Sequence, residues 1–194
     1  MTKPRMNLSG VPALVVDGDN YSVGLMLQML RGLGLESPSV VNTIAEAKPL
    51  LENRQYDLMI CEAELPDGDG ARFVSWLRHL KSQNRFIPVI AVTSYSHLRN
   101  VTGMRDAGAH IVLRKPVSPQ ALFDHIHWSA KSPRPFVELR NYTGPDRRFK
   151  FAGPPSGNGR RESDLSHEIG DAMEPNLSQS EIDSWMKPMK VSVE

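Results

Sequence analysis

Residues 57–70 read DLMICEAELPDGDG, an apolar run that ends at Glu62 and leads, four residues later, into Pro66 and a turn rich in glycine and aspartate. The run Asp57–Cys61 is short and continuously apolar, which is typical of a strand covered on both faces of a parallel sheet. Gly, Pro and Asp are the residues that end such strands in loops. The stretch therefore predicts a buried strand that delivers the Glu62 carboxylate to its carboxyl end.

Outward from this stretch, the first 133 residues contain five short apolar runs, each followed by a segment with helical periodicity. This alternation is typical of a parallel sheet wrapped by helices. The fold class that we expect is α/β, a doubly wound five-stranded parallel sheet of (βα)5 order. The strands are expected at Val11–Val16, Ser39–Val41, Asp57–Cys61, Ile87–Val92 and Ala109–Leu113. The helices are expected at about Tyr21–Leu33, Thr43–Asn53, Ala71–Ser82, His97–Ala107 and Pro119–Lys131.

Four polar side chains fall where predicted strands end. They are Asp17, Glu62, Thr93 and Lys115. In open parallel sheets, functional groups gather beyond the carboxyl ends of the strands, at the point where the strand order reverses. We therefore expect these four residues to form one site.

The charge of the chain is divided unequally along its 194 residues. The net charge is +1, but residues 134–161 carry seven basic and two acidic groups, whereas residues 162–194 carry two basic and eight acidic groups. The composition after Lys131 is rich in Pro, Gly and Arg, which indicates a linker rather than a core. The predicted organisation is a leader at 1–10, a domain at 11–131, a largely disordered linker at 132–176, a short amphipathic peptide at 177–188 and a terminus at 189–194.

The single cysteine, Cys61, lies in the apolar run and excludes an internal disulfide, which favours a reducing cytoplasm. No signal sequence and no apolar run of about 18 residues are present, so we expect no membrane insertion. The six histidines show no metal-ligand or catalytic spacing, and His125 and His127 point different ways on a predicted helix. No enzyme class is therefore expected.

Four motifs together resemble the receiver domain of bacterial response regulators, of which CheY is the single-domain example. They are LVVD at 14–17, LPDGDG at 65–70, AVTS at 91–94 and LRKP at 113–116. The resemblance covers about the first 131 residues and implies a flavodoxin-like receiver fold. It also implies roles: an acidic pair that holds Mg²⁺, an acceptor aspartate that takes a phosphoryl group, and Lys115 and Thr93 as ligands of that group. Pro116 follows the lysine, and that peptide bond is often cis in this family.

This sequence departs from the receiver pattern at two site positions. Gly18 stands at the second acidic position and Glu62 stands at the acceptor position. Loss of an oxygen ligand weakens a site for Mg²⁺, which demands near-ideal octahedral geometry. Asp19 is adjacent, but we interpret it as a loop or helix-capping residue. We therefore expect Mg²⁺ binding at Asp17 and Asp19 to be weakened or absent, and no other cofactor at this site. The family's aromatic switch position is also changed, to Val112, which favours a fixed module over a phosphorylation switch.

The longer Glu62 side chain places its oxygens where phosphoryl oxygens would lie, within reach of Lys115 and Thr93. We therefore predict a phosphorylation-independent pseudo-receiver: a non-catalytic signalling adaptor of two-component, chemotaxis or flagellar control that acts through protein contacts. A site that has decayed into a packing cluster gives the same absence of phosphorylation. The competing interpretation is an ordinary phospho-accepting response regulator.

The basic segment 134–161 interleaves arginines with aromatic residues, a combination suited to guanine bases and phosphates. Its run YTGPDRR at 142–148 resembles the arginine-rich tails of CheY-like effectors that bind cyclic di-GMP. The nucleotide-binding candidates on this hypothesis are Arg140, Asp146, Arg147, Arg148, Arg160 and Arg161. A solvated linker or a weak polynucleotide contact remains an alternative, and specific nucleic-acid binding is not expected.

Residues 177–186 read LSQSEIDSWM and resemble the N-terminal peptide of the flagellar motor switch protein. The spacing also has the Ser-x-x-Glu form of a helix start. The candidate docking residues are Leu177, Glu181, Ile182, Asp183, Trp185 and Met186. We expect this peptide to bind a signalling or flagellar protein, or to dock on the receiver of its own chain.

Overall fold

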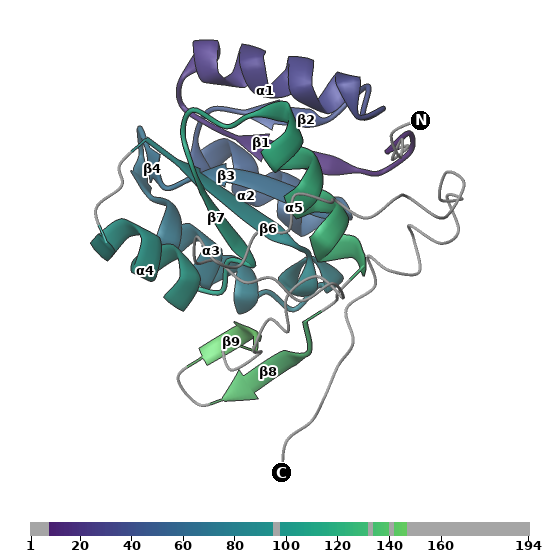
Figure 1. Ribbon diagram of the computed structural model, residues 1–194. Coiled ribbons are helices and arrows are strands. Elements are labelled where there is room, and N and C mark those ends of the chain that lie inside the picture. The colour runs from purple at the N-terminus through teal and green to yellow at the C-terminus, as the bar shows by residue number, and fades with distance from the viewer. Residues whose placement is uncertain (1–7, 95–97, 132–133, 140–141, 147–194) are drawn as a thin grey trace, which may run out of the picture.

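A computed structural model of the chain describes residues 8–94, 98–131, 134–139 and 142–146 (Figure 1). Five parallel strands form the central sheet in the order β2-β1-β3-β6-β7. Their bounds are Ala13–Val16 (β1), Ser39–Val41 (β2), Leu58–Glu62 (β3), Val89–Thr93 (β6) and Ile111–Arg114 (β7). The predicted five-stranded α/β sheet is confirmed, with every strand close to its predicted position.

Five α-helices cover the two faces of the sheet (Figure 1). Their bounds are Asn20–Gly32 (α1), Ile44–Asn53 (α2), Gly70–Arg78 (α3), Leu98–Asp106 (α4) and Pro119–Lys131 (α5). Buried residues of α1 and α5 share one core cluster, whereas those of α2, α3 and α4 share the other. The sheet is therefore enclosed on both sides, as its continuously apolar strands predict. None of the described helices combines the length and the apolar character needed to cross a membrane.

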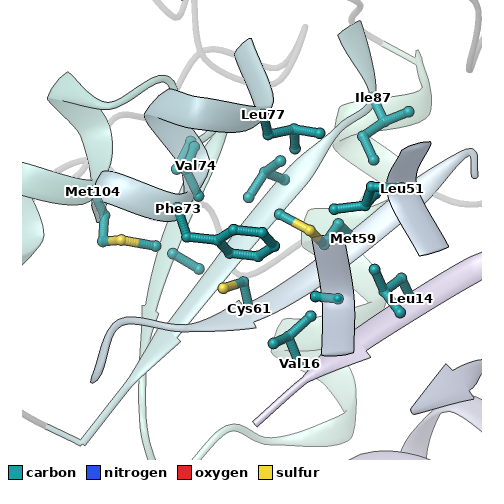
Figure 2. Close-up of a cluster of buried hydrophobic side chains, with 14 of the residues drawn as sticks. Leu14, Val16, Leu51, Met59, Cys61, Phe73, Val74, Leu77, Ile87 and Met104 are labelled. Atoms are coloured by element: carbon teal, nitrogen blue, oxygen red, sulfur yellow. The ribbon is translucent and has the colours of Figure 1, made fainter. Parts of the chain in front are cut away.

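Strand β3 contributes to both cores because successive side chains of a strand point to opposite faces. Leu58 and Ile60 belong to the α1–α5 side, whereas Met59 and Cys61 belong to the other side. Figure 2 shows Met59 and Cys61 against Phe73 of α3 in that second cluster. Burying each large apolar side chain contributes about 1.5–3 kcal/mol, so this strand is fixed in register and Glu62 at its end is fixed with it.

Helix α3 ends at Arg78, four residues before its predicted end at Ser82. The chain then forms a 3-10 helix, η1 (Gln83–Phe86), that leads into β6. Asn84 anchors this turn from within the core, because its side chain accepts a hydrogen bond from the Tyr56 N–H and donates to two carbonyls of the α2–β3 segment. The apolar period of the sequence continues past Arg78, but the helix is capped at His79 and the chain turns into η1, which these tertiary hydrogen bonds hold in place.

Two hairpins form separate two-stranded sheets beside the central one. The first is a small one at the site, β4 (Glu64–Leu65) with β5 (Gly68–Asp69). The second consists of β8 (Phe136–Leu139) and β9 (Tyr142–Pro145) and lies in the stretch predicted to be a linker. That part of the prediction is corrected: Phe136 is 2% exposed and packs on the domain, which a linker does not do. The rest of the predicted linker, the leader to residue 7, and the peptide at 177–188 lie outside the described residues.

Candidate functional site

The carboxyl edge of the sheet brings the predicted site residues together. Asp17 directly follows β1, Glu62 ends β3, Thr93 ends β6 and Lys115 directly follows β7. Asp17, Glu62 and Thr93 are buried, and the Lys115 side chain is 19% exposed. Convergence follows from the parallel order, in which β1, β3, β6 and β7 are neighbours.

Lys115 joins the two carboxylates. Its ammonium donates to Asp17 Oδ2 at 2.7 Å and forms an ion pair with Glu62 Oε2. Burial by itself lowers the pKa of Lys115, but hydrogen bonds and charges from Asp17 and Glu62 outweigh burial and raise the pKa above its usual value. The ammonium is therefore held in its charged form, and we call Asp17, Glu62 and Lys115 the acidic–lysine cluster.

The Glu62 carboxylate is held at both oxygens. While Oε2 faces Lys115, Oε1 accepts a hydrogen bond from the Ala63 N–H at 2.8 Å. The predicted pairing of Glu62 with Lys115 is confirmed. The predicted hydrogen bond from Thr93 to Glu62 stays a prediction, although the Thr93 side chain is buried at the adjacent strand end.

Asp17 is also fully engaged. Its Oδ1 accepts the Asp19 N–H at 2.9 Å, and its Oδ2 accepts the Ser22 hydroxyl at 2.7 Å in addition to Lys115. Ser22 is absent from the sequence prediction. Its hydroxyl in the first turn of α1, five residues after Asp17, is the signal that could have identified it.

Asp19 is the N-cap of α1, as predicted. Its carboxylate accepts hydrogen bonds from the Tyr21 N–H at 3.1 Å and the Ser22 N–H at 3.4 Å. Such a cap satisfies backbone donors that have no partner within the helix. The carboxylate is directed to the helix and does not replace the acid that is missing at position 18.

Gly18 lies under the ring of Pro66. A Cβ atom at position 18 would come within 2.5 Å of both Cγ and Cδ of Pro66, a separation that real Cβ atoms do not adopt. The space of the second acidic side chain is thus filled from the opposite loop. An aspartate at position 18 requires the Pro66 loop to move.

The loop that carries Pro66 is itself tied down. Both carboxylate oxygens of Asp67 accept backbone N–H groups at the start of α2, from Ile44 and Ala45, at 2.9 Å each. These hydrogen bonds, the one from Ile44 foremost, lower the pKa of Asp67. Asp67 therefore links the loop that carries Pro66 to α2, a role that the sequence alone does not reveal.

The donor set does not fit the Mg²⁺ ion that the receiver resemblance implies. Position 18 supplies no oxygen, Asp19 caps a helix, and both oxygens of Asp17 and of Glu62 are already hydrogen bonded or paired. In the described part of the chain, no three His, Cys, Asp or Glu side chains group together as metal ligands would. A small hard cation that demands octahedral oxygen ligands finds too few of them here.

Other predicted features fall near the cluster. The Lys115–Pro116 peptide bond is cis, as the resemblance implies. Val112 in β7 is partly buried and packs on the core. The buried Cys61 has its pKa raised, first by burial and then by the charges of Glu62 and Asp17, so the thiol is neutral and unreactive.

Of the nucleotide-binding candidates, only Asp146 is described. Its N–H donates to the Pro135 carbonyl at 2.8 Å and closes the base of the β8–β9 hairpin. The five arginine candidates lie outside the described residues: Arg140, Arg147, Arg148, Arg160 and Arg161. The six candidate docking residues also lie outside: Leu177, Glu181, Ile182, Asp183, Trp185 and Met186.

Comparison with known proteins places a receiver over most of the described chain. Residues 13–127 match the response regulator receiver domain family. A probable transcriptional regulatory protein, y4xI of Sinorhizobium fredii, is 30% identical over 106 residues, which cover 53% of this chain and 46% of that protein. The polar-differentiation response regulator DivK of Brucella anthropi is 27% identical over 113 residues, which cover 58% of this chain and 90% of DivK.

The fold comparison agrees. The crystal structure of a CheY-like receiver domain protein from Methanospirillum hungatei is similar, with a TM-score of 0.55 and 28% identity over 60% of this chain and 90% of that chain. The chain spans less than half of the first curated relatives that it matches, from 26% to 46% of their length. The similarity therefore concerns the receiver and not the remaining parts of those proteins.

Proposed function

The chain belongs to the response regulator receiver domain family, and we propose that it is a pseudo-receiver: a signalling adaptor whose state does not depend on phosphorylation. The observation that carries this proposal is the acidic–lysine cluster, in which Lys115 already binds two carboxylates. In the receiver pattern, the lysine binds the oxygens of a phosphoryl group. Here the Glu62 carboxylate takes that place.

The chemistry of phosphoryl transfer supports the proposal. Attack on a phosphoryl donor needs a free carboxylate oxygen in line with the leaving group. Both oxygens of Glu62 already have a partner, the Ala63 N–H for Oε1 and Lys115 for Oε2, so attack by either oxygen competes with a contact that holds the side chain. The charge of an incoming phosphate also needs a metal, and Gly18 under Pro66 removes an oxygen ligand from that site.

We propose that the output is a protein contact rather than catalysis. The relative DivK, a response regulator, is matched over 90% of its length by this chain, so a receiver makes up most of that protein. Chemotaxis or flagellar control is the pathway that we propose, on the resemblance of residues 177–186 to the motor switch peptide. Action in the cytoplasm rests on the sequence alone.

The test is a titration of the ¹⁵N-labelled full chain with beryllofluoride and Mg²⁺, a stable analogue of the phosphoryl group. We expect the backbone amides of Ala63, Thr93 and Lys115 to keep their chemical shifts. Saturable shifts at these amides contradict the proposal. The Glu62→Gln variant is the matched control, because a response that is lost in this variant identifies Glu62 as the ligand.

A second candidate function is binding of cyclic di-GMP, and the β8–β9 hairpin favours it. Asp146 closes the base of the hairpin through the Pro135 carbonyl, Phe136 of that hairpin packs on the domain, and Asp146 directly precedes Arg147 and Arg148 in sequence. A nucleotide held by these arginines is therefore adjacent to the receiver. Calorimetry on the full chain tests this: saturable heat should disappear in the Arg147→Ala/Arg148→Ala variant and persist in Arg72→Ala, which changes an exposed arginine of α3. Absence of heat from the unaltered chain contradicts it.

A further inference from the structure

A hollow of about 570 Å³ lies at the amino-terminal edge of the sheet, opposite the acidic–lysine cluster. It is lined by one residue of the segment that enters β3 and by five of the segment that enters β6. The lining residues are Gln55, Lys81, Ser82, Gln83, Arg85 and Phe86. None of the six is acidic, and the proposed receiver function does not use any of them.

The walls of the hollow are held in place from behind. Asn84 donates to the carbonyls of Leu51 and Arg54 at 2.6 Å each, which fixes η1 against the segment that contains Gln55. On the other side, the Arg85 guanidinium pairs with Glu138 of β8 at 2.8 Å, which ties η1 to the hairpin. The hollow is therefore formed before any ligand arrives, so little ordering is required on binding.

The hollow presents positive charge, and two donors without acceptors in the described part of the chain lie beneath its surface. Ser82 Oγ and Arg85 Nε are buried and have no hydrogen-bond partner among the described residues. Lys81 adds an exposed ammonium, and the Arg85 guanidinium lies over the Phe86 ring at 5.1 Å from its centre. Glu138 offsets one of the two positive charges, so the hollow keeps a net positive charge. Carboxylate oxygens are the groups that pair with this charge.

We propose that this hollow binds carboxylates of the chain's own acidic segment, residues 162–194. That segment carries eight acidic and two basic residues, whereas the hollow is basic, so the two are complementary in charge. The tether is also short. Asp146 is hydrogen bonded to Pro135 at the base of the hairpin. Glu138, which contacts Arg85, lies three residues after Pro135 along β8, so the hairpin base and Glu138 are about 10 Å apart at 3.3 Å per residue.

The chain between the two parts is long enough to bridge them. Fifteen residues lie between Asp146 and Glu162, and even a random coil of that length spans about 20 Å. Because the contact is intramolecular, its effective concentration is high and each single ion pair need not be strong. Docking also keeps residues 177–188 at the amino-terminal edge, which regulates their access to a partner.

The experiment uses the full chain with a nitroxide on one introduced cysteine, Ser166→Cys, in the acidic segment. The native Cys61 is buried, so it does not compete for the label. Paramagnetic broadening of backbone amides is then recorded by NMR. We expect broadening at Gln55 and at residues 81–86, none at Ala63 or Lys115, and loss of the broadening at high salt.

Two variants and one mixture decide the result. Lys81→Glu should abolish the broadening at residues 81–86. Arg72→Glu is the matched control, because it makes the same charge change at an exposed position near the start of α3, and it should leave the broadening intact. Broadening that survives Lys81→Glu, that maps to α4 and α5 instead, or that is absent overturns the proposal. So does broadening that appears only on unlabelled chains mixed with spin-labelled ones, since that contact is between molecules.

Discussion

At the scale of single residues, the contacts that Glu62 and Gly18 make explain why the site differs from the receiver pattern. One methylene separates glutamate from aspartate at position 62, yet it lets the carboxylate reach Lys115 while its other oxygen caps the next peptide N–H. The two departures from the receiver pattern are readable from the sequence. What the sequence does not reveal is that Pro66 covers Gly18, because that contact joins residues 48 positions apart.

Restoring the missing acid should destabilise the fold. A Gly18→Asp side chain meets the Pro66 ring, and overpacking of this kind costs about 1–3 kcal/mol in the free energy of unfolding. Urea denaturation measures the loss. The control is Gly24→Asp, where an added Cβ meets nothing within 4 Å. A Gly18→Asp variant as stable as the Gly24→Asp variant contradicts the proposed role of Pro66.

His110 should make the folded state sensitive to acid. Burial, with the charges of Arg78 and Arg134 after it, lowers the pKa of His110 well below its usual value, and its Nδ1 accepts the Val89 N–H. The unfolded imidazole takes up a proton as pH falls below about 6.5, whereas the folded imidazole does not, so stability falls with pH in that window.

The expected slope from His110 is up to about 1.4 kcal/mol per pH unit below pH 6.5. Urea midpoints between pH 5 and 8 measure it. His110→Gln, which keeps an acceptor for the Val89 N–H, should flatten this part of the profile. His79→Gln, at an exposed position, is the control. An unchanged profile in His110→Gln rules out this origin of the acid sensitivity.

At the scale of elements, the apolar periodicity of the sequence predicts the strands and helices whose apolar residues are close together in the sequence. The five strands and the helices follow from apolar runs and their spacing, and most of them contribute buried side chains to one of the two core clusters. The β8–β9 hairpin does not follow from such a pattern, because its anchor Phe136 is buried against Arg78, Phe86 and His110, which belong to distant elements. Composition rich in Pro and Arg indicates a linker there, and tertiary packing overrides it.

Arg78 is the element-scale anchor whose removal should be most costly. Its guanidinium is fully buried, donates to the carbonyls of Gly108, Arg85 and Ile87, and lies over Phe136; burial lowers its pKa to about 9. Arg78→Met leaves three carbonyls without these donors and should cost about 3–5 kcal/mol in unfolding free energy.

The measurement for Arg78→Met is again urea denaturation, with amide exchange of β8 and β9 as a second readout. Arg72→Met, at an exposed position of the same helix, should change stability by less than about 0.5 kcal/mol. If Arg78→Met leaves both the midpoint and the exchange of the hairpin unchanged, the hairpin is not held by this side chain.

At the scale of the whole molecule, the two edges of the sheet carry different features. The carboxyl edge holds the closed acidic–lysine cluster, and the amino edge holds the hairpin and the basic hollow. The sequence predicts the first because receiver motifs fall at strand ends. It predicts the charge of the terminal segments but not the hollow, because the hollow is built from two segments joined through Asn84 and Glu138.

The measurement that tests the central claim most directly is the intact mass of the full chain after incubation with acetyl phosphate and Mg²⁺. Because Glu62 is held by Lys115 and the Ala63 N–H, we predict that the mass stays that of the unmodified chain. A phosphoryl adduct that maps to Glu62, and that is absent from Glu62→Gln, would show that the cluster opens to accept phosphate and would contradict a phosphorylation-independent pseudo-receiver.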